Sequence, residues 1–86
     1  MDRIAVIGII LEKPEISQKQ VNETVSQFKS IIKGRMGIPF DDRNMAVISI
    51  TLQGDLDSIN ALTGKLGKIE HVTVKTTISK SLDQNI

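Results

Sequence analysis

Residues 3–11 read Arg3-Ile4-Ala5-Val6-Ile7-Gly8-Ile9-Ile10-Leu11, a run that is rich in β-branched side chains. The run is too short for a buried helix and therefore predicts a strand. Both alternating sets of its side chains are apolar, which is typical of a strand in the middle of a covered sheet. The segment Lys13-Pro14-Glu15 then ends the strand, because proline has no N–H and favours an extended residue before it.

A helix is predicted next, from about Ser17 to about Ser30. Ser17 followed by Gln20 fits a capping box at a helix start. An apolar stripe follows at helical spacing, made of Val21, Val25, Phe28 and Ile32. Residues 31–38 then predict an extended segment whose two glycines suit an edge strand or a bulge. Residues 40–44 are typical of a polar turn.

The second half of the chain alternates strand and helix again. Residues 45–52 predict a strand, with Ala46, Ile48, Ile50 and Leu52 on one face. Asp55 is a good N-cap for a second helix, and a left-handed C-cap is expected at Gly67. Residues 70–78 alternate as a last strand. Residues 79–86 are expected to fray.

The order is β-α-β-β-α-β, which predicts an α+β, ferredoxin-like sandwich: a four-stranded antiparallel sheet with two helices on one face. We expect a single domain over residues 1–80 and a flexible tail over residues 81–86. The other sheet face would be bare, and the first strand is apolar on both sides. The residues expected on that face are Ala5, Ile7, Ile9 and Val47. Exposed apolar patches mark association surfaces, so we expect a homo-oligomer, a dimer or a tetramer; a partner protein on the same face is the alternative.

Composition narrows the possible functions. A chain of 86 residues has room for little more than one core, and the absence of cysteine excludes disulfides and thiolate metal sites. The net charge of +1 gives no field that would attract nucleic acid. The apolar run at residues 4–11 is too short for a membrane span and lacks the features of a signal peptide, so a cytoplasmic protein is expected.

Few residues point to catalysis or nucleic-acid binding. His71 is the single histidine, and a metal site would need further ligands beside it. The carboxylates of Asp41 and Asp42 lie in a predicted turn. No nucleophile–base pair is visible. We therefore expect a protein that is not an enzyme and that binds neither a metal nor a cofactor. The aromatic residues Phe28 and Phe40 lie on a helix and in a turn, which leaves no base-stacking platform on the sheet.

Two glycine-bearing stretches remain, Gly34-Arg35-Met36-Gly37-Ile38-Pro39 and Leu62-Thr63-Gly64-Lys65-Leu66-Gly67. Neither is a P-loop. A glycine inside a helix costs about 1 kcal/mol relative to alanine, so Gly64 suggests close approach of another backbone or of a ligand. For a small effector, Arg35 would bind an anionic group, and Gly34, Gly37 and Gly64 would allow close backbone approach.

These two stretches, with Ala46-Val47-Ile48-Ser49-Ile50, resemble the family of iron-only hydrogenase system regulators. The similarity runs from about Arg3 to Lys80. Members resemble ACT domains and the C-terminal domain of the nickel-responsive repressor, so the resemblance implies a ferredoxin-like fold and regulation through small-molecule or metal sensing. The chain departs from those relatives in having one histidine and, at residues 12–15, a loop without the glycine that ACT domains use.

We therefore expect a stand-alone, non-enzymatic regulatory domain linked to an iron-only hydrogenase system. It would oligomerise through its sheet and bind a small effector between subunits, without direct contact to nucleic acid or membrane. The alternative is an adaptor that docks on another protein through the apolar face. A third class, a small enzyme of the dimeric α+β barrel type, would need a sheltered acid or base, and the sequence offers no candidate.

Overall fold

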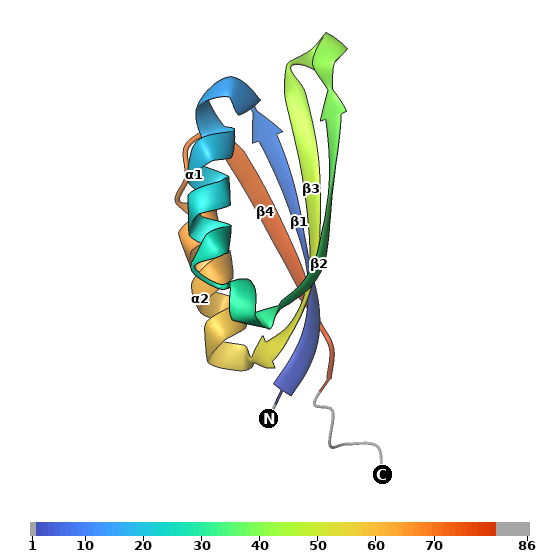
Figure 1. The fold of residues 1–86 in the computed structure, drawn as a ribbon, viewed down its shortest axis with the longest axis vertical. Helices are drawn as coiled ribbons and strands as arrows, with labels where there is room; N and C mark the ends of the chain where they lie inside the picture. Colours follow the sequence, from blue (N-terminus) through green and yellow to red (C-terminus); the bar gives the residue numbers. More distant parts are fainter. Residues whose placement is uncertain (1, 81–86) are drawn as a thin grey trace.

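The apolar run near the start of the chain forms β1 (Asp2–Glu12), which lies between β3 (Met45–Asp55) and β4 (Val72–Ile78). β2 (Ile32–Phe40) completes an antiparallel sheet of order β2-β3-β1-β4. The helices α1 (Pro14–Ser26) and α2 (Leu56–Gly67) cover one face of this sheet in a computed structural model that describes residues 2–80 (Figure 1). The predicted βαββαβ sandwich is confirmed.

The core lies between the helices and the sheet. Its members are buried aliphatic side chains: Ala5, Ile7, Ile9, Leu11, Val21, Val25, Ile48, Ile50, Leu52, Ile59, Leu62 and Leu66. Each buried valine, leucine or isoleucine side chain contributes about 1.5–3 kcal/mol of hydrophobic free energy. Every second residue from Ala5 to Leu11 and from Ile48 to Leu52 is an apolar core residue, and each helix adds an apolar stripe. Together these side chains form one continuous core.

The prediction that Ala5, Ile7 and Ile9 lie on the bare face is wrong, because all three side chains are at most 1% exposed beneath the helices. The register explains the reversal. Ala5 pairs with Leu52, Ile7 with Ile50 and Ile9 with Ile48, and paired residues point to the same side of a sheet. The inner face of β3 is strongly apolar, so its partners on β1 turn inwards with it.

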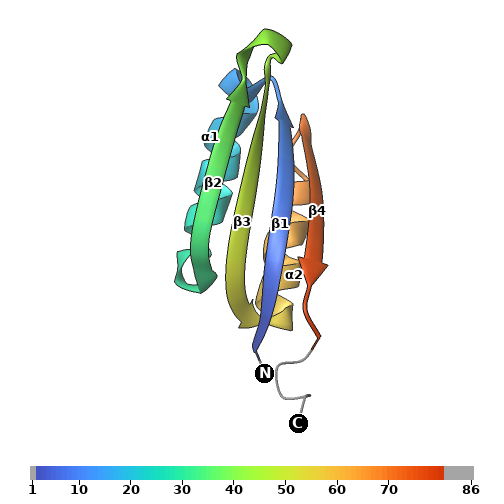
Figure 2. The ribbon, with the colours of Figure 1, turned by 90° about the vertical axis from the view of Figure 1, so that its right-hand side faces the viewer.

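The opposite set of side chains forms the outer face of the sheet, which neither α1 nor α2 covers (Figure 2). Six large apolar residues on it are between 40% and 61% exposed: Ile4, Val6, Ile10, Met36, Ile38 and Phe40. Val47 pairs with Ile10 and with Ile38 and is half-buried among them. We call this set of seven residues the outer apolar face.

Helix α1 begins earlier than predicted, at Pro14 rather than at Ser17. Proline is favoured in the first helical turn, where its missing N–H costs nothing. Ser17 makes no capping box: it is buried inside the helix, and its hydroxyl donates to the carbonyl oxygens of Glu12 (3.1 Å) and Lys13 (3.3 Å). The helix ends at Ser26, and a 3₁₀ turn, Lys29–Ile31, leads into β2.

Helix α2 begins as predicted and ends differently. The Asp55 carboxylate accepts hydrogen bonds from the Ser58 backbone N–H (3.2 Å) and hydroxyl (2.6 Å), which confirms the N-cap. Gly67 is the last helical residue, and Lys68 caps the helix with right-handed backbone angles. None of the glycines, all of which lie within residues 2–80, has a positive φ, so the left-handed cap predicted at Gly67 is wrong.

The edges of the sheet follow the glycine pattern. β2 is an edge strand with a register shift between Ile32 and Gly34, as its glycines predicted. Beyond β4, Ser79 is tied to β1: its N–H donates to the Ile4 carbonyl (2.8 Å) and its hydroxyl accepts from the Ile4 N–H (3.0 Å). The predicted fraying therefore does not include Ser79, and the tail expected at residues 81–86 lies outside the described residues.

Within residues 2–80, neither helix has the length and hydropathy needed to cross a membrane.

Candidate functional site

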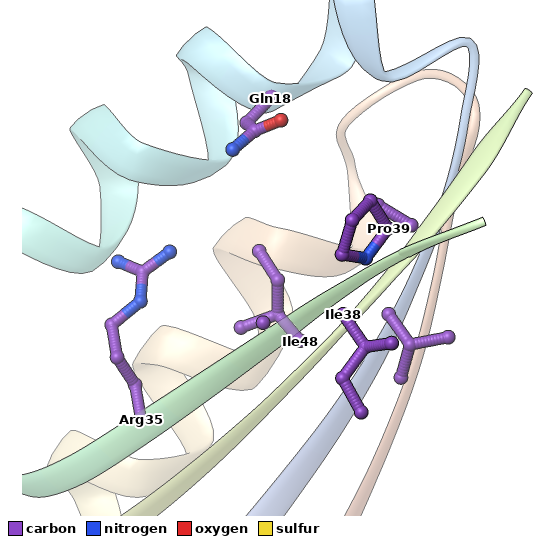
Figure 3. Close-up of a pocket in the computed structure, with 8 residues that line it drawn as sticks. Gln18, Arg35, Ile38, Pro39 and Ile48 are labelled. Carbon is purple, nitrogen blue, oxygen red and sulfur yellow. The ribbon is translucent and has the colours of Figure 1, made fainter. Parts of the chain in front are cut away.

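A pocket of about 260 Å³ lies between α1 and the β2–β3 hairpin (Figure 3). Helix α1 contributes Gln18, and the two strands supply the rest of the wall. The lining residues are Gln18, Arg35, Gly37, Ile38, Pro39, Ala46, Val47 and Ile48. In Figure 3 the Arg35 side chain extends from β2 towards α1 and the Gln18 side chain from α1 towards the strands, on the same side of the sheet as Ile48 and Pro39.

Arg35 reaches the pocket because of strand alternation. Residues 35, 37 and 39 of β2 lie on the side of the sheet that faces the helices, opposite Ile38. Neither α1 nor α2 packs over this edge strand, and every residue from Lys33 to Phe40 is exposed. The Arg35 guanidinium donates from Nη2 to the Asn22 Oδ1 atom on α1 at 2.9 Å. This bond holds the cation at the pocket while leaving other N–H donors of the guanidinium free.

The pocket combines one positive charge with an apolar floor. Arg35 is the single charged residue among the eight that line it, and Gln18 adds an amide. Ile48 is 3% exposed and belongs to the core. A Cβ atom added to Gly37 would lie 3.9 Å from the Ile48 Cγ1 atom, so glycine keeps the floor open. The arrangement suits a small ligand that has an anionic group and an apolar part.

Two of the four predicted ligand residues meet in the pocket. Arg35 and Gly37 line it, whereas Gly34 lies on the outer side of β2, paired with Thr51. Gly64 lies exposed on α2, and an added Cβ atom there would meet nothing within 4 Å. Among residues 2–80, therefore, no other backbone closely approaches Gly64, and neither Gly34 nor Gly64 lines the pocket.

Sequence reasoning missed the helical side of the pocket. Gln18 lines it and Asn22 binds Arg35. These two residues are spaced i and i+4 and so lie on one face of α1. A pair of amides on the exposed face of a helix was the signal in the sequence, but nothing local indicates that the face lies opposite Arg35.

His71 does not lie on β4 as predicted but in the turn before it. Its backbone is left-handed, with a φ of 68°, and its carbonyl accepts a hydrogen bond from the Glu12 N–H at 2.8 Å. Within the described part of the chain, no group of three histidine, cysteine, aspartate or glutamate side chains is placed to hold a metal ion. His71 therefore contributes its backbone to the turn before β4.

Comparison with known proteins places the chain in a family. A family model described as "TM1266-like: Iron-only hydrogenase system regulator, putative" matches residues 3–76. The chain belongs to this family. The solved structure of TM1266 from Thermotoga maritima is 41% identical to this TM1266-like chain, with a TM-score of 0.89 over 93% of this chain and all of that one. No curated protein matches.

Two more distant structures share the fold of the TM1266-like chain. The ACT domain of GTP pyrophosphokinase from Chlorobium tepidum is 23% identical, with a TM-score of 0.76 over 90% of this chain and all of that domain. SnoaB, a cofactor-independent oxygenase from Streptomyces nogalater, is 11% identical, with a TM-score of 0.58 over 94% of both chains. At these identities the likeness concerns the fold alone, and it confirms the ACT-like fold. The function has to be argued from the residues of the site.

Proposed function

We propose that the TM1266-like chain is a stand-alone, non-enzymatic regulatory domain, residues 1–80, which acts in the cytoplasm for an iron-only hydrogenase system. It binds a small anionic effector in the pocket beside Arg35. It associates with a second copy of itself through the outer apolar face. The family description and the ACT-like fold support the regulatory assignment.

The observation that carries the effector proposal is the composition of the pocket. A cation at its rim and an apolar floor supply affinity and orientation for a small anion. The eight lining residues include no cysteine, serine, histidine or carboxylate that could act as a nucleophile or a base. Binding without turnover is the chemistry that these side chains support.

Native mass spectrometry of the purified protein tests the effector proposal. A small anion retained by the wild-type protein and lost from Arg35→Ala, with the far-UV circular dichroism unchanged, supports it. Retention that is equal in both proteins contradicts the assignment to this pocket. Lys33→Ala is the matched control, because it removes a neighbouring exposed cation on β2 that does not line the pocket.

The dimensions of the outer face support a second copy as its partner. The sheet is seen face-on in Figure 2, and the long and short extents of the molecule, 48 Å by 17 Å, bound this face at about 800 Å². A stable interface buries on the order of 800 Å² on each partner. This upper limit equals the area that such an interface needs, so a second copy would have to cover nearly the whole outer face.

Val6→Lys tests this association, since Val6 lies on the outer face and is 47% exposed. We expect light scattering after gel filtration to show an oligomer for the wild type and a folded monomer for Val6→Lys. Ile16→Lys is the control: Ile16 is 57% exposed on α1, away from the sheet, and should leave the oligomer intact. A monomeric, aggregation-prone wild type would instead favour the adaptor that docks on another protein.

A further inference from the structure

We propose that the effector is a small carboxylic acid that carries no amino group, such as a branched 2-oxo acid or a short branched fatty acid. This inference rests on the proposed function of the Arg35 pocket as an effector site and names the chemical class of its ligand. It follows from the charges, the size and the surface of the pocket.

Charge excludes the zwitterionic amino acids as the preferred class. Arg35 supplies one positive charge, and none of the eight lining residues is acidic. A carboxylate can form a two-point, charge-assisted contact with a guanidinium. A ligand ammonium group would lose part of its hydration beside Arg35 and find no carboxylate in exchange, which is unfavourable. The pocket therefore selects a net anion over a zwitterion of the same shape.

Size and surface favour an organic anion with a compact apolar body. A pocket of about 260 Å³ lies below the roughly 300–1,000 Å³ of sites that take drug-sized ligands, so it suits a smaller organic ligand. Its floor is formed by Pro39, Ala46 and the core residue Ile48. Inorganic phosphate would pair with the Arg35 guanidinium but would leave this apolar surface exposed to water.

The geometry of Arg35 adds an internal test of charge recognition. The guanidinium is already held by a neutral acceptor, the Asn22 Oδ1 atom, at 2.9 Å. Asn22→Asp would place a carboxylate at this position and neutralise the cation from within the protein. The ligand would then compete with a permanent internal anion, although the shape of the pocket would be unchanged.

The experiment is isothermal titration of the full-length protein with 4-methyl-2-oxopentanoate and with leucine, which have the same number of non-hydrogen atoms and differ in the amino group. Inorganic phosphate is the third probe. We expect the 2-oxo acid to bind at least tenfold more tightly than leucine or phosphate. Asn22→Asp should weaken this binding at least tenfold without lowering the Tm.

Gln18→Glu provides the converse variant, because it adds the acidic group that the pocket lacks. This variant should bind the 2-oxo acid more weakly and leucine more tightly than the wild type does. The ratio of the two affinities should therefore fall or reverse. Lys33→Ala, outside the pocket, should leave both affinities unchanged.

Three results would overturn the inference. Leucine binding as tightly as the 2-oxo acid would show that the amino group is tolerated, and tight binding of phosphate alone would show that the apolar floor is not used. In both cases, loss of binding in Arg35→Ala would still uphold the effector site. Binding of the 2-oxo acid that survives Arg35→Ala would refute both the inference and the site.

Discussion

Among the six glycines, Gly54 leaves the least room for a side chain. It is buried at the end of β3, and an added Cβ atom would lie 2.9 Å from the Ile31 Cγ2 atom and 3.2 Å from its Cβ atom. The 3₁₀ turn that ends in Ile31 therefore packs directly on the β3 backbone. The lack of a side chain at Gly54 is therefore a packing requirement.

Gly54→Ala should lower the free energy of unfolding by about 1–3 kcal/mol, because the branched Cβ atom of Ile31 cannot move without its backbone. Urea denaturation measures this change. Gly64→Ala is the matched control: its added methyl group meets open space, and the higher helix propensity of alanine should raise the free energy of unfolding by about 1 kcal/mol. A lower free energy of unfolding for Gly64→Ala would contradict the open surroundings of Gly64.

Asp55 couples helix capping to pH. Hydrogen bonds from the Ser58 hydroxyl and N–H hold the pKa of its carboxyl below the usual value. A pKa that is lower in the folded state means that the ionised cap stabilises the fold above about pH 4, the unfolded value, and that this contribution is lost as pH falls through the folded pKa.

Asp55→Asn keeps an acceptor for the Ser58 N–H but removes the titrating charge. We expect a lower urea midpoint than that of the wild type at pH 7, and a difference that shrinks towards zero as the pH falls below 4. If the urea midpoints of the two proteins differed by the same amount at pH 7 and at pH 2.5, the charge of Asp55 would not be what stabilises the cap.

At the scale of elements, three turns meet at one end of the sheet. Lys13, Asn44 and His71 are the non-glycine residues with positive φ among residues 2–80. The Lys13 N–H donates to the Asn44 carbonyl at 3.2 Å, and the Glu12 N–H donates to the His71 carbonyl. The starts of α1, β3 and β4 are therefore joined by backbone hydrogen bonds, and left-handed residues make these turns possible.

Lys13→Gly should raise the free energy of unfolding by roughly 0.5–1 kcal/mol. Relief of left-handed strain, about 1–2 kcal/mol for most residues, exceeds the entropic cost of glycine. Chemical denaturation checks the effect. Asn44→Gly is the comparison. It should raise the free energy of unfolding by less, since asparagine already tolerates the left-handed conformation. A destabilised Lys13→Gly protein would indicate that the lysine side chain stabilises the turn.

At the scale of the whole molecule, the sheet has one covered face and one open face. The helices bury the inner face, and six large apolar side chains remain on the outer face. Exposed apolar patches of this extent mark association surfaces. The free energy of folding should therefore be linked to assembly.

If a second copy covers the outer face, the Tm should rise with protein concentration, because association stabilises the folded state by mass action. Differential scanning calorimetry over a hundredfold range of concentration measures this. The Val6→Lys protein should lose the dependence. A wild-type Tm that is independent of concentration would contradict assembly through this face.

Local patterns predicted much of this fold. The inner face of β3, the Asp55 cap and the edge position of β2 follow from alternation, side-chain chemistry and glycine content within a few residues. Arg35 and Gly37 are two residues apart on a strand, so alternation alone places them on one side of the sheet. These features were predictable because each depends on a short segment of chain.

The tertiary structure decided the rest. Both faces of β1 are apolar, so nothing within residues 3–11 could show that Ala5, Ile7 and Ile9 turn inwards; their register with β3 settles it. Likewise, only the folded chain brings Asn22 on α1 within hydrogen-bond distance of Arg35 on β2, and only the turn before β2 gives Gly54 its role. The sequence by itself determined the order of elements and the chemistry available to them, whereas the buried face and the pocket depend on contacts between segments that are distant along the chain.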